Sequence, residues 1–319
     1  MKKTAQIKIF TLSTFTLSLL IVPVFAQGIP ETTRNMTISP PAIEKTLSPG
    51  DKTEGILKII NDGTNELVFT VSVQDYIVED AKGTPVFLPE DTLSNKYSAA
   101  NWIAVIPRNI TVKPKEKIEL NYYLQIPQDA RPGGHYAGII FKPTTTMEVK
   151  GTGAAVNTQI GSLFYVNIKG PISESAGVAK FFSNWFNEYG PVKLSTQIKN
   201  NGDLHITPQG KITVTNIFGQ KVETQELSSH NIFPGGVVRD FENSVGRKWM
   251  FGPYKASLLA SYGVNNNLPL SATVTFWVIP WKIILLVVLT TAAVALGVLY
   301  LKKRKKKAKL AELSKQHQE

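Results

Sequence analysis

Few side chains in this sequence have types and spacings that could do chemistry. The four histidines are His135, His205, His230 and His317, and none has a second histidine or a carboxylate at metal-ligand spacing. The chain has no cysteine, which excludes disulfides, thiolate nucleophiles and cysteine metal sites. It also lacks a nucleophile elbow, a phosphate-binding loop and a paired-carboxylate pattern. We therefore expect a protein that is not an enzyme, with no catalytic, cofactor-binding or metal-ligating residues.

The polar residues that remain fit structural roles. His135 follows a Pro-Gly-Gly turn, where we expect a strand to begin, and a structural histidine is the favoured interpretation. Asp62, Asp80 and Asp203 lie in or beside turns. Short acidic side chains accept hydrogen bonds from nearby backbone N–H groups at such positions, which accounts for them without calcium.

The net charge of +11 is concentrated at the two ends of the chain. Residues 1–26 contain only cationic charges, residues 302–319 are strongly basic, and the stretch between them is nearly neutral. A nucleic-acid-binding fold carries its basic residues on the folded domain itself. The distribution therefore predicts no nucleic-acid partner and assigns the basicity to the termini.

Residues 1–26 have the pattern of a secretory signal peptide. A cationic start precedes a short apolar run, and small residues stand at Val24 and Ala26. We expect cleavage between Ala26 and Gln27, followed by a linker over residues 27–35. An uncleaved N-terminal anchor is the alternative, disfavoured because the apolar run is short and interrupted by polar residues.

Residues 279–301 are long and apolar enough to form a transmembrane helix. Trp277 and Trp281 precede it, where an aromatic belt would meet the bilayer surface. A basic cluster follows it: Lys302, Lys303, Arg304, Lys305, Lys306 and Lys307. Because cytoplasmic flanks are enriched in Lys and Arg, we expect a single-pass protein with residues 302–319 as a cytoplasmic tail and the N-terminal domains outside.

Three further interpretations of the C-terminus are open. The basic cluster could bind anionic lipid headgroups in addition to setting orientation. Small residues near Gly297 could pack against another membrane helix. The segment Leu268–Ala272 is loosely similar to a sortase signal, although its alternating pattern continues to Val278 and favours a strand.

Residues 36–278 show the two-residue alternation of β-strands, for example Ile118–Ile126 and Val192–Ile198. Gly-, Pro- and Asn-rich turns recur about every ten residues between them. Short strands with frequent turns predict antiparallel β-sandwiches. We expect an all-β protein with two tandem immunoglobulin-like sandwiches, over 36–170 and 171–278, before the transmembrane helix.

A weak internal repeat supports two related domains. The stretch Ile56–Gly63 is similar to Leu194–Gly202, and in each a strand ends in an Asn-rich turn. This pattern is typical of a hairpin between two strands of a sandwich.

The densest aromatic stretch spans residues 181–189. It contains Phe181, Phe182, Trp185, Phe186 and Tyr189. One interpretation is packing at the interface between the two domains or along the edge of the second domain. The other is a patch that binds a partner or lies near the membrane, since aromatic residues are enriched at both kinds of interface.

Five strand and turn motifs stand out in the expected β-domains: Ile38–Pro41, Leu47–Gly50, Ile59–Asp62, Pro132–Gly138 and Ile198–Gly202. With these motifs, the whole pattern resembles the WxL-interacting proteins, bacterial surface proteins with two immunoglobulin-like domains and a C-terminal membrane helix. The resemblance implies a first domain that contacts peptidoglycan or another wall polymer and a second that binds a secreted surface protein.

The first domain begins with Ser39–Pro40, followed by the Pro49–Gly50 turn and the Asn61 turn. In these features it also looks like the first domain of periplasmic pilus chaperones. This likeness implies binding by strand addition, although those chaperones are soluble and this chain has a membrane helix. We therefore expect a membrane-anchored surface protein that binds a wall polymer, another exported protein or both. A membrane-tethered chaperone or assembly factor is the alternative.

Overall fold

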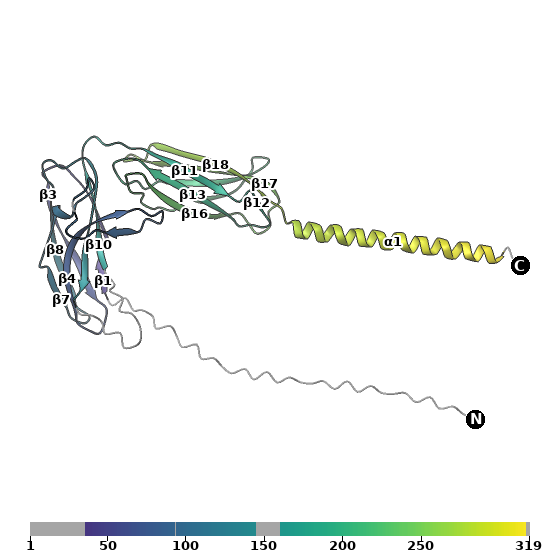
Figure 1. Ribbon diagram of the computed structural model, residues 1–319, viewed down its shortest axis with the longest axis horizontal. Coiled ribbons are helices and arrows are strands. Elements are labelled where there is room, and N and C mark those ends of the chain that lie inside the picture. The colour runs from purple at the N-terminus through teal and green to yellow at the C-terminus, as the bar shows by residue number, and fades with distance from the viewer. Residues whose placement is uncertain (1–35, 93, 145–159, 317–319) are drawn as a thin grey trace, which may run out of the picture.

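The computed structural model describes residues 36–92, 94–144 and 160–316. They form two β-sandwiches, set at an angle to each other, and one long helix that leads away from the second (Figure 1). The prediction of an all-β fold with a C-terminal helix is confirmed. The expected signal peptide, the cleavage site between Ala26 and Gln27, the linker and His317 lie outside the described residues.

The first domain has two facing sheets. Strand β8 alternates between buried and exposed side chains as the sequence predicts, whereas β9 is buried at nine consecutive residues. One sheet has the order β1 (Met36–Ser39), β3 (Lys52–Asn61), β8 (Lys117–Gln125) and β6 (Ile103–Ile106). The other has the order β2 (Ala42–Leu47), β10 (Ile160–Ile168), β9 (Gly133–Pro143), β4 (Leu67–Val78) and β5 (Pro85–Phe87), with β7 (Asn109–Val112) also paired to β4. Leu57, Ile59, Phe141 and Phe164 are fully buried between the sheets.

The second domain is a smaller sandwich of the same kind. Its three-stranded sheet has the order β11 (Ala176–Ser183), β13 (Val192–Asn200) and β16 (Val237–Val245). Its five-stranded sheet has the order β12 (Phe186–Asn187), β18 (Leu268–Val278), β17 (Gly252–Tyr262), β14 (Gln209–Asn216) and β15 (Lys221–Glu226). The core between them contains Leu194, Ile198, Phe241 and Phe276.

In both domains the first strand is divided between the two sheets. In the first domain β1 pairs antiparallel with β3, and the chain then crosses over so that β2 pairs parallel with β10. In the second domain β11 pairs antiparallel with β13, and β12 then pairs parallel with β18. The two domains therefore share an architecture, as the internal repeat indicates.

The matching Asn-rich turns have the same hydrogen bonds. The buried Asn61 side chain donates to the carbonyls of Asn65 and Val112 at 2.7 and 3.0 Å, and its amide oxygen accepts from the N–H of Gly63. Asn200 is likewise buried, and it donates to the carbonyls of Leu204 and Ile232 at 2.8 and 2.9 Å. Each asparagine satisfies backbone groups that would otherwise be buried without a partner.

Helix α1 (Trp281–Gln316) is long and apolar enough to cross a membrane, and its apolar window has no surface buried in the rest of the protein. It begins at residue 281 instead of the expected 279. The N–H of Ile279 still bonds to Asn187 of the strand region, and Pro280 disfavours a helical conformation at the residue before it. The helix continues past residue 301, through the basic cluster.

We predict that Asn200→Ala lowers the free energy of unfolding of the second domain by about 2–3 kcal/mol, because it leaves two buried carbonyls and one backbone N–H without their partner. Urea titration of the purified full-length chain in detergent measures this change. The neighbouring Asn201 is exposed, and its side chain makes none of these bonds, so Asn201→Ala is the matched control. Equal loss in the two variants would contradict the role of Asn200.

Candidate functional site

Aromatic side chains from both domains pack together at the domain junction. Tyr76 and Tyr136 from the first domain surround Phe233 from the second, with ring centroids 5.8 and 4.9 Å from it. All three residues are buried. The two sandwiches are therefore joined by a small hydrophobic core of their own.

Polar contacts reinforce this junction. The Tyr136 hydroxyl accepts the backbone N–H of His205 at 3.0 Å, and the His205 ring reaches Glu44 with a separation of 3.4 Å between Nε2 and Oε1. The hydrogen bond from His205 and a second one from Asn167 lower the pKa of Glu44. Arg131 pairs with Asp203 at 3.1 Å. These contacts add a polar link between the two domains.

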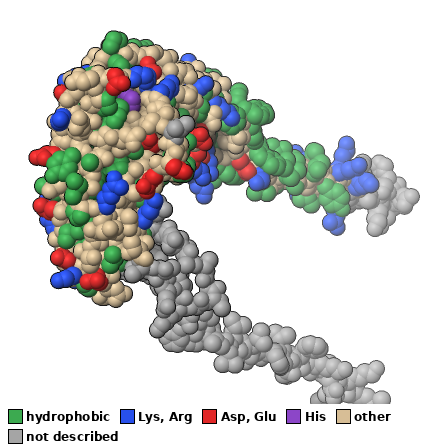
Figure 2. Space-filling view, turned by 60° about the vertical axis from the view of Figure 1, so that its left-hand side comes forward, with side chains coloured by type: hydrophobic (Ala, Val, Ile, Leu, Met, Phe, Trp, Pro, Cys, Tyr) green, Lys and Arg blue, Asp and Glu red, His purple; other side chains and the backbone are tan. Residues whose placement is uncertain are grey.

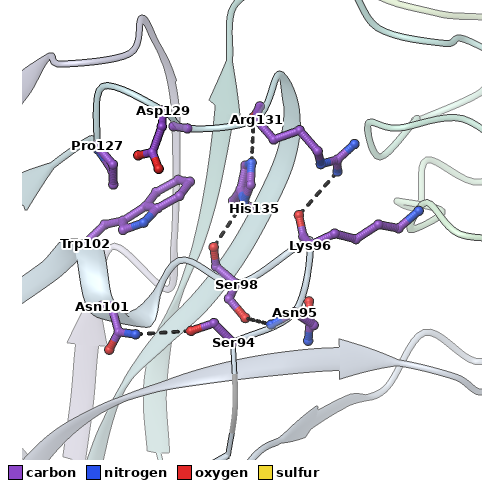
Figure 3. A pocket seen from close by; sticks show the side chains of 11 residues that line it. Ser94, Asn95, Lys96, Ser98, Asn101, Trp102, Pro127, Asp129, Arg131 and His135 are labelled. Carbon is purple, nitrogen blue, oxygen red and sulfur yellow. Dashed lines mark hydrogen bonds between the residues drawn. The ribbon is translucent and has the colours of Figure 1, made fainter.

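A polar pocket of roughly 300 Å³ lies beside the junction (Figure 3). Its walls come from the segment 94–102, which includes the 3₁₀ turn Ala100–Trp102, from the loop 127–131, and from His135 on β9. The side chains of Asn101 and Asp129 line it, next to the indole of Trp102. Its volume is at the lower end of the range for small-molecule sites.

His135 in this pocket has a structural role. Its Nδ1 and Nε2 lie 3.0 and 2.8 Å from the carbonyl oxygens of Ser98 and Arg131, and its ring packs 4.4 Å from that of Trp102. Burial lowers the pKa of His135, and the two carbonyl oxygens oppose this shift. Within the described residues no group of three or more His, Cys, Asp or Glu side chains could hold a metal ion.

One edge of β18 is unpaired over most of its length. β18 pairs with β17 along its whole length. On its other side only Trp277 and Val278 are paired, with the two-residue strand β12. Among the described residues no strand pairs with positions 268–276 on that side, although β11 of the other sheet lies nearby. In the first domain, β2 covers the equivalent edge of β10 from Leu163 to Ile168.

The free N–H groups on this edge can be assigned. The N–H groups of Trp277 and Ile279 donate across it, to the carbonyls of Trp185 and Asn187 at 2.7 and 2.9 Å. Residues two apart in a strand direct their backbone groups to the same side. The N–H groups of Ser271, Thr273 and Thr275 therefore point to the open edge, and in the described part of the chain they have no acceptor.

The aromatic segment 181–189 lies at the end of the second domain farthest from the first. Phe181 packs against the core of its own domain, whereas Phe182, Trp185 and Phe186 are exposed. Tyr189 packs edge-on to Trp249 at 5.6 Å. None of these residues contributes to the aromatic cluster at the junction, so the structure does not support the interdomain interpretation. Binding of a partner by this segment remains a prediction.

The predicted membrane-flanking residues lie where β18 meets α1. Trp277 and Trp281 are both exposed there, and the basic cluster Lys302–Lys307 is exposed further along the helix. Sequence reasoning missed the β18 edge and the junction contacts of His205. Pro269 was the available signal for an edge strand, because proline cannot donate to a ladder.

We predict that the free energy of unfolding of the first domain, which contains His135, decreases as the pH falls below about 6.5, the ordinary pKa of histidine. Because folding lowers the pKa of His135, the unfolded chain binds more protons than the folded chain in this range, and protonation favours unfolding. His135→Gln should therefore lose less stability than the natural chain between pH 7.5 and pH 5.5, measured by urea titration. Parallel curves for the two proteins would contradict this assignment.

No family model and no curated protein matches this sequence. Among solved structures, the chain is similar to the class 5 fimbriae chaperone CfaA, with a TM-score of 0.40 and 11% identity over 75% of this chain and 98% of that one. It is similar to the Pseudomonas aeruginosa CupB2 chaperone, with a TM-score of 0.35 and 8% identity over 76% and 100%. A Porphyromonas gingivalis protein of unknown function matches with a TM-score of 0.27 and 13% identity over 76% and 100%. At these values the comparisons assign no family, and the resemblance to WxL-interacting proteins stays a prediction.

Proposed function

We infer that this chain is a non-enzymatic, membrane-anchored binding protein that takes up an extended segment of another exported protein by strand addition at β18. The observation that carries this proposal is the unpaired edge of β18, with three N–H groups directed outward. An edge of this kind is a ready template for a further strand, and many peptide-recognition domains bind in this way.

The chemistry of the edge suits such a ligand. Each backbone hydrogen bond to an added strand would contribute about 0.5–1.5 kcal/mol. Ser271, Thr273 and Thr275 present exposed hydroxyls on the outer face for cross-strand contacts. On the inner face Ala272 and Val274 are only partly buried, so an apolar side chain of the added strand could complete the rim of the core. The edge has no charged side chain between residues 268 and 278.

The helix and the domain junction would determine where the β18 edge lies relative to a membrane. We infer that α1 spans a membrane, that the basic residues after it stay in the cytoplasm, and that both sandwiches lie outside. The aromatic core at the junction would then hold the first domain in a fixed direction relative to the binding edge. Such a protein can act as a surface scaffold or as a tethered chaperone during assembly of surface structures. A fimbriae chaperone and another chaperone are among the similar solved structures, but the proposal rests on the geometry of β18.

The strand-addition proposal is tested by Thr273→Pro in the full-length chain expressed in its own cells. Proline removes the central outward N–H and leaves the ladder with β17 intact, so partner binding should fall by at least about tenfold, equivalent to 1.4 kcal/mol. Thr273→Val keeps the N–H and is the matched control, expected to bind as the natural chain does.

Partner binding is measured by cross-linking from a cysteine introduced at one position. Because the natural chain has no cysteine, each variant carries a single reactive thiol. A cysteine at Thr273 should cross-link to an exported protein. The yield of cross-linked product should fall when Ser271→Pro removes one of the outward N–H groups of β18. A cysteine at the exposed Leu259 of β17, one strand further from the edge, is the control for random capture. Equal capture from the two positions would overturn strand addition at β18.

Binding of peptidoglycan or another wall polymer is a second candidate function. The polar pocket beside Trp102 favours it, since amide, carboxylate and indole groups together can bind a sugar. If this pocket binds the wall, the full-length chain in detergent should sediment with purified wall material, and Asp129→Ala should weaken sedimentation while Thr273→Pro should not. Sedimentation that is absent, or unchanged by Asp129→Ala, would remove this candidate.

A further inference from the structure

Exposed aromatic residues gather at the end of the second domain that adjoins α1. Four of the five tryptophans in the chain lie here: Trp185, Trp249, Trp277 and Trp281. Trp185 and Trp249 are 73% and 65% exposed, and Phe251 and Phe218 are 69% and 81% exposed. These values decide against a core role, because such side chains have little protein around them.

The strand register places these residues at one end, although they are far apart in the sequence. Phe218 lies in the turn after β14, whose last residue Asn216 pairs with Tyr254 at the start of β17. Gly252, which follows Phe251, pairs with Val278 at the end of β18. Trp185 bonds through its carbonyl to the N–H of Trp277. Three separate loops and the start of α1 therefore form a single loop end.

This loop end is joined closely to the helix. Only Ile279 and Pro280 separate β18 from α1. Lys282 in the first turn of the helix pairs with Glu188 at 2.8 Å, and the N–H of Ile279 donates to the Asn187 carbonyl. In Figure 2 the hydrophobic surface of α1 continues onto the adjoining end of the domain. A bilayer crossed by α1 would therefore reach the loops themselves.

Cationic groups accompany the aromatic ones. Arg247 and Lys248 lie in the same loop as Trp249, and the Lys248 ammonium is 5.5 Å from the Trp249 ring centroid. The Lys282 ammonium is 5.6 Å from the ring centroid of Trp281. Aromatic rings with neighbouring Lys and Arg suit the interfacial layer of a membrane, where rings sit among headgroups and cations meet lipid phosphates.

We propose that this loop end rests on the bilayer that α1 crosses, with Trp185, Phe218, Trp249 and Phe251 in the headgroup layer. The occupant of the surface is the lipid headgroup region, because the patch is continuous with the membrane helix and carries cations that match lipid phosphates. The inference rests on the membrane anchoring in the proposed function, and it adds a second contact that fixes the tilt of the domain. With its tilt fixed, the β18 edge would be held at a constant angle to the membrane surface.

The test uses the full-length chain in vesicles of phosphatidylcholine and phosphatidylglycerol. An environment-sensitive fluorophore is attached to a single cysteine at Phe218→Cys, Val264→Cys or Leu289→Cys. Val264 is 66% exposed and lies at the opposite end of the domain, so it is the matched control, and Leu289 is in the apolar part of α1. We expect the label at residue 218 to shift to the blue and to be quenched by lipids that carry a quencher near the headgroup, while the label at 264 is not.

Any other outcome contradicts the proposal. The label at position 289 then shows whether only the contact of the loop end fails or the membrane anchoring fails as well. If the label at 218 behaves like that at 264 while the label at 289 is quenched by a mid-chain quencher, the loop end does not touch the membrane but the helix still spans it. If the label at 289 is not quenched either, the membrane anchoring itself fails. A blue shift at 218 without lipid quenching, together with a disulfide between two unlabelled Phe218→Cys chains when an oxidant such as copper phenanthroline is added, would assign the surface to a second copy.

Discussion

The edge strands of each sandwich have backbone N–H and C=O groups that need hydrogen-bond partners. Both domains meet this constraint with a first strand that is divided between the two sheets. In the first domain the second part of that strand, β2, covers six residues of β10. In the second domain the corresponding β12 covers two residues of β18 and leaves the remaining edge unpaired. The same solution therefore closes one domain and leaves an opening in the other, and that difference is the basis of the proposed binding function.

The rest of the molecule fixes the position of this opening. The cluster of Tyr76, Tyr136 and Phe233 joins the sandwiches, and the contact of His205 with Glu44 adds a polar link across the same junction. At the other end of the second domain, two residues and the Lys282–Glu188 pair connect it to the helix. With these contacts at both ends of the second domain, the two domains and the membrane helix would move together as one unit. A binding edge on such a unit would meet its partner at a defined height and angle.

Much of this could be predicted from the sequence, because it depends on local pattern. Alternation identified strands such as β8 and β13, and the repeated Asn-rich turns indicated two related domains. Asn61 and Asn200 carry that repeat because each satisfies the backbone of its own turn. The apolar run fixed the helix, although Pro280 shifted its start. The site itself could not be predicted, because the edge of β18 and the loop end that unites Trp185, Phe218 and Trp249 depend on which distant strands pair. Periodicity shows that a strand exists, but it does not show which neighbour it lacks.

The central claim is that the outer edge of β18 is open in the free protein, and amide hydrogen exchange measured by NMR on the full-length chain tests it most directly. The N–H groups of Leu270, Ala272 and Val274 face β17, so we predict slow exchange for them. We predict fast exchange for Ser271, Thr273 and Thr275, so that protection alternates along the strand. Uniform protection of all six amides would mean that the edge is already covered, and it would contradict the proposed mode of binding.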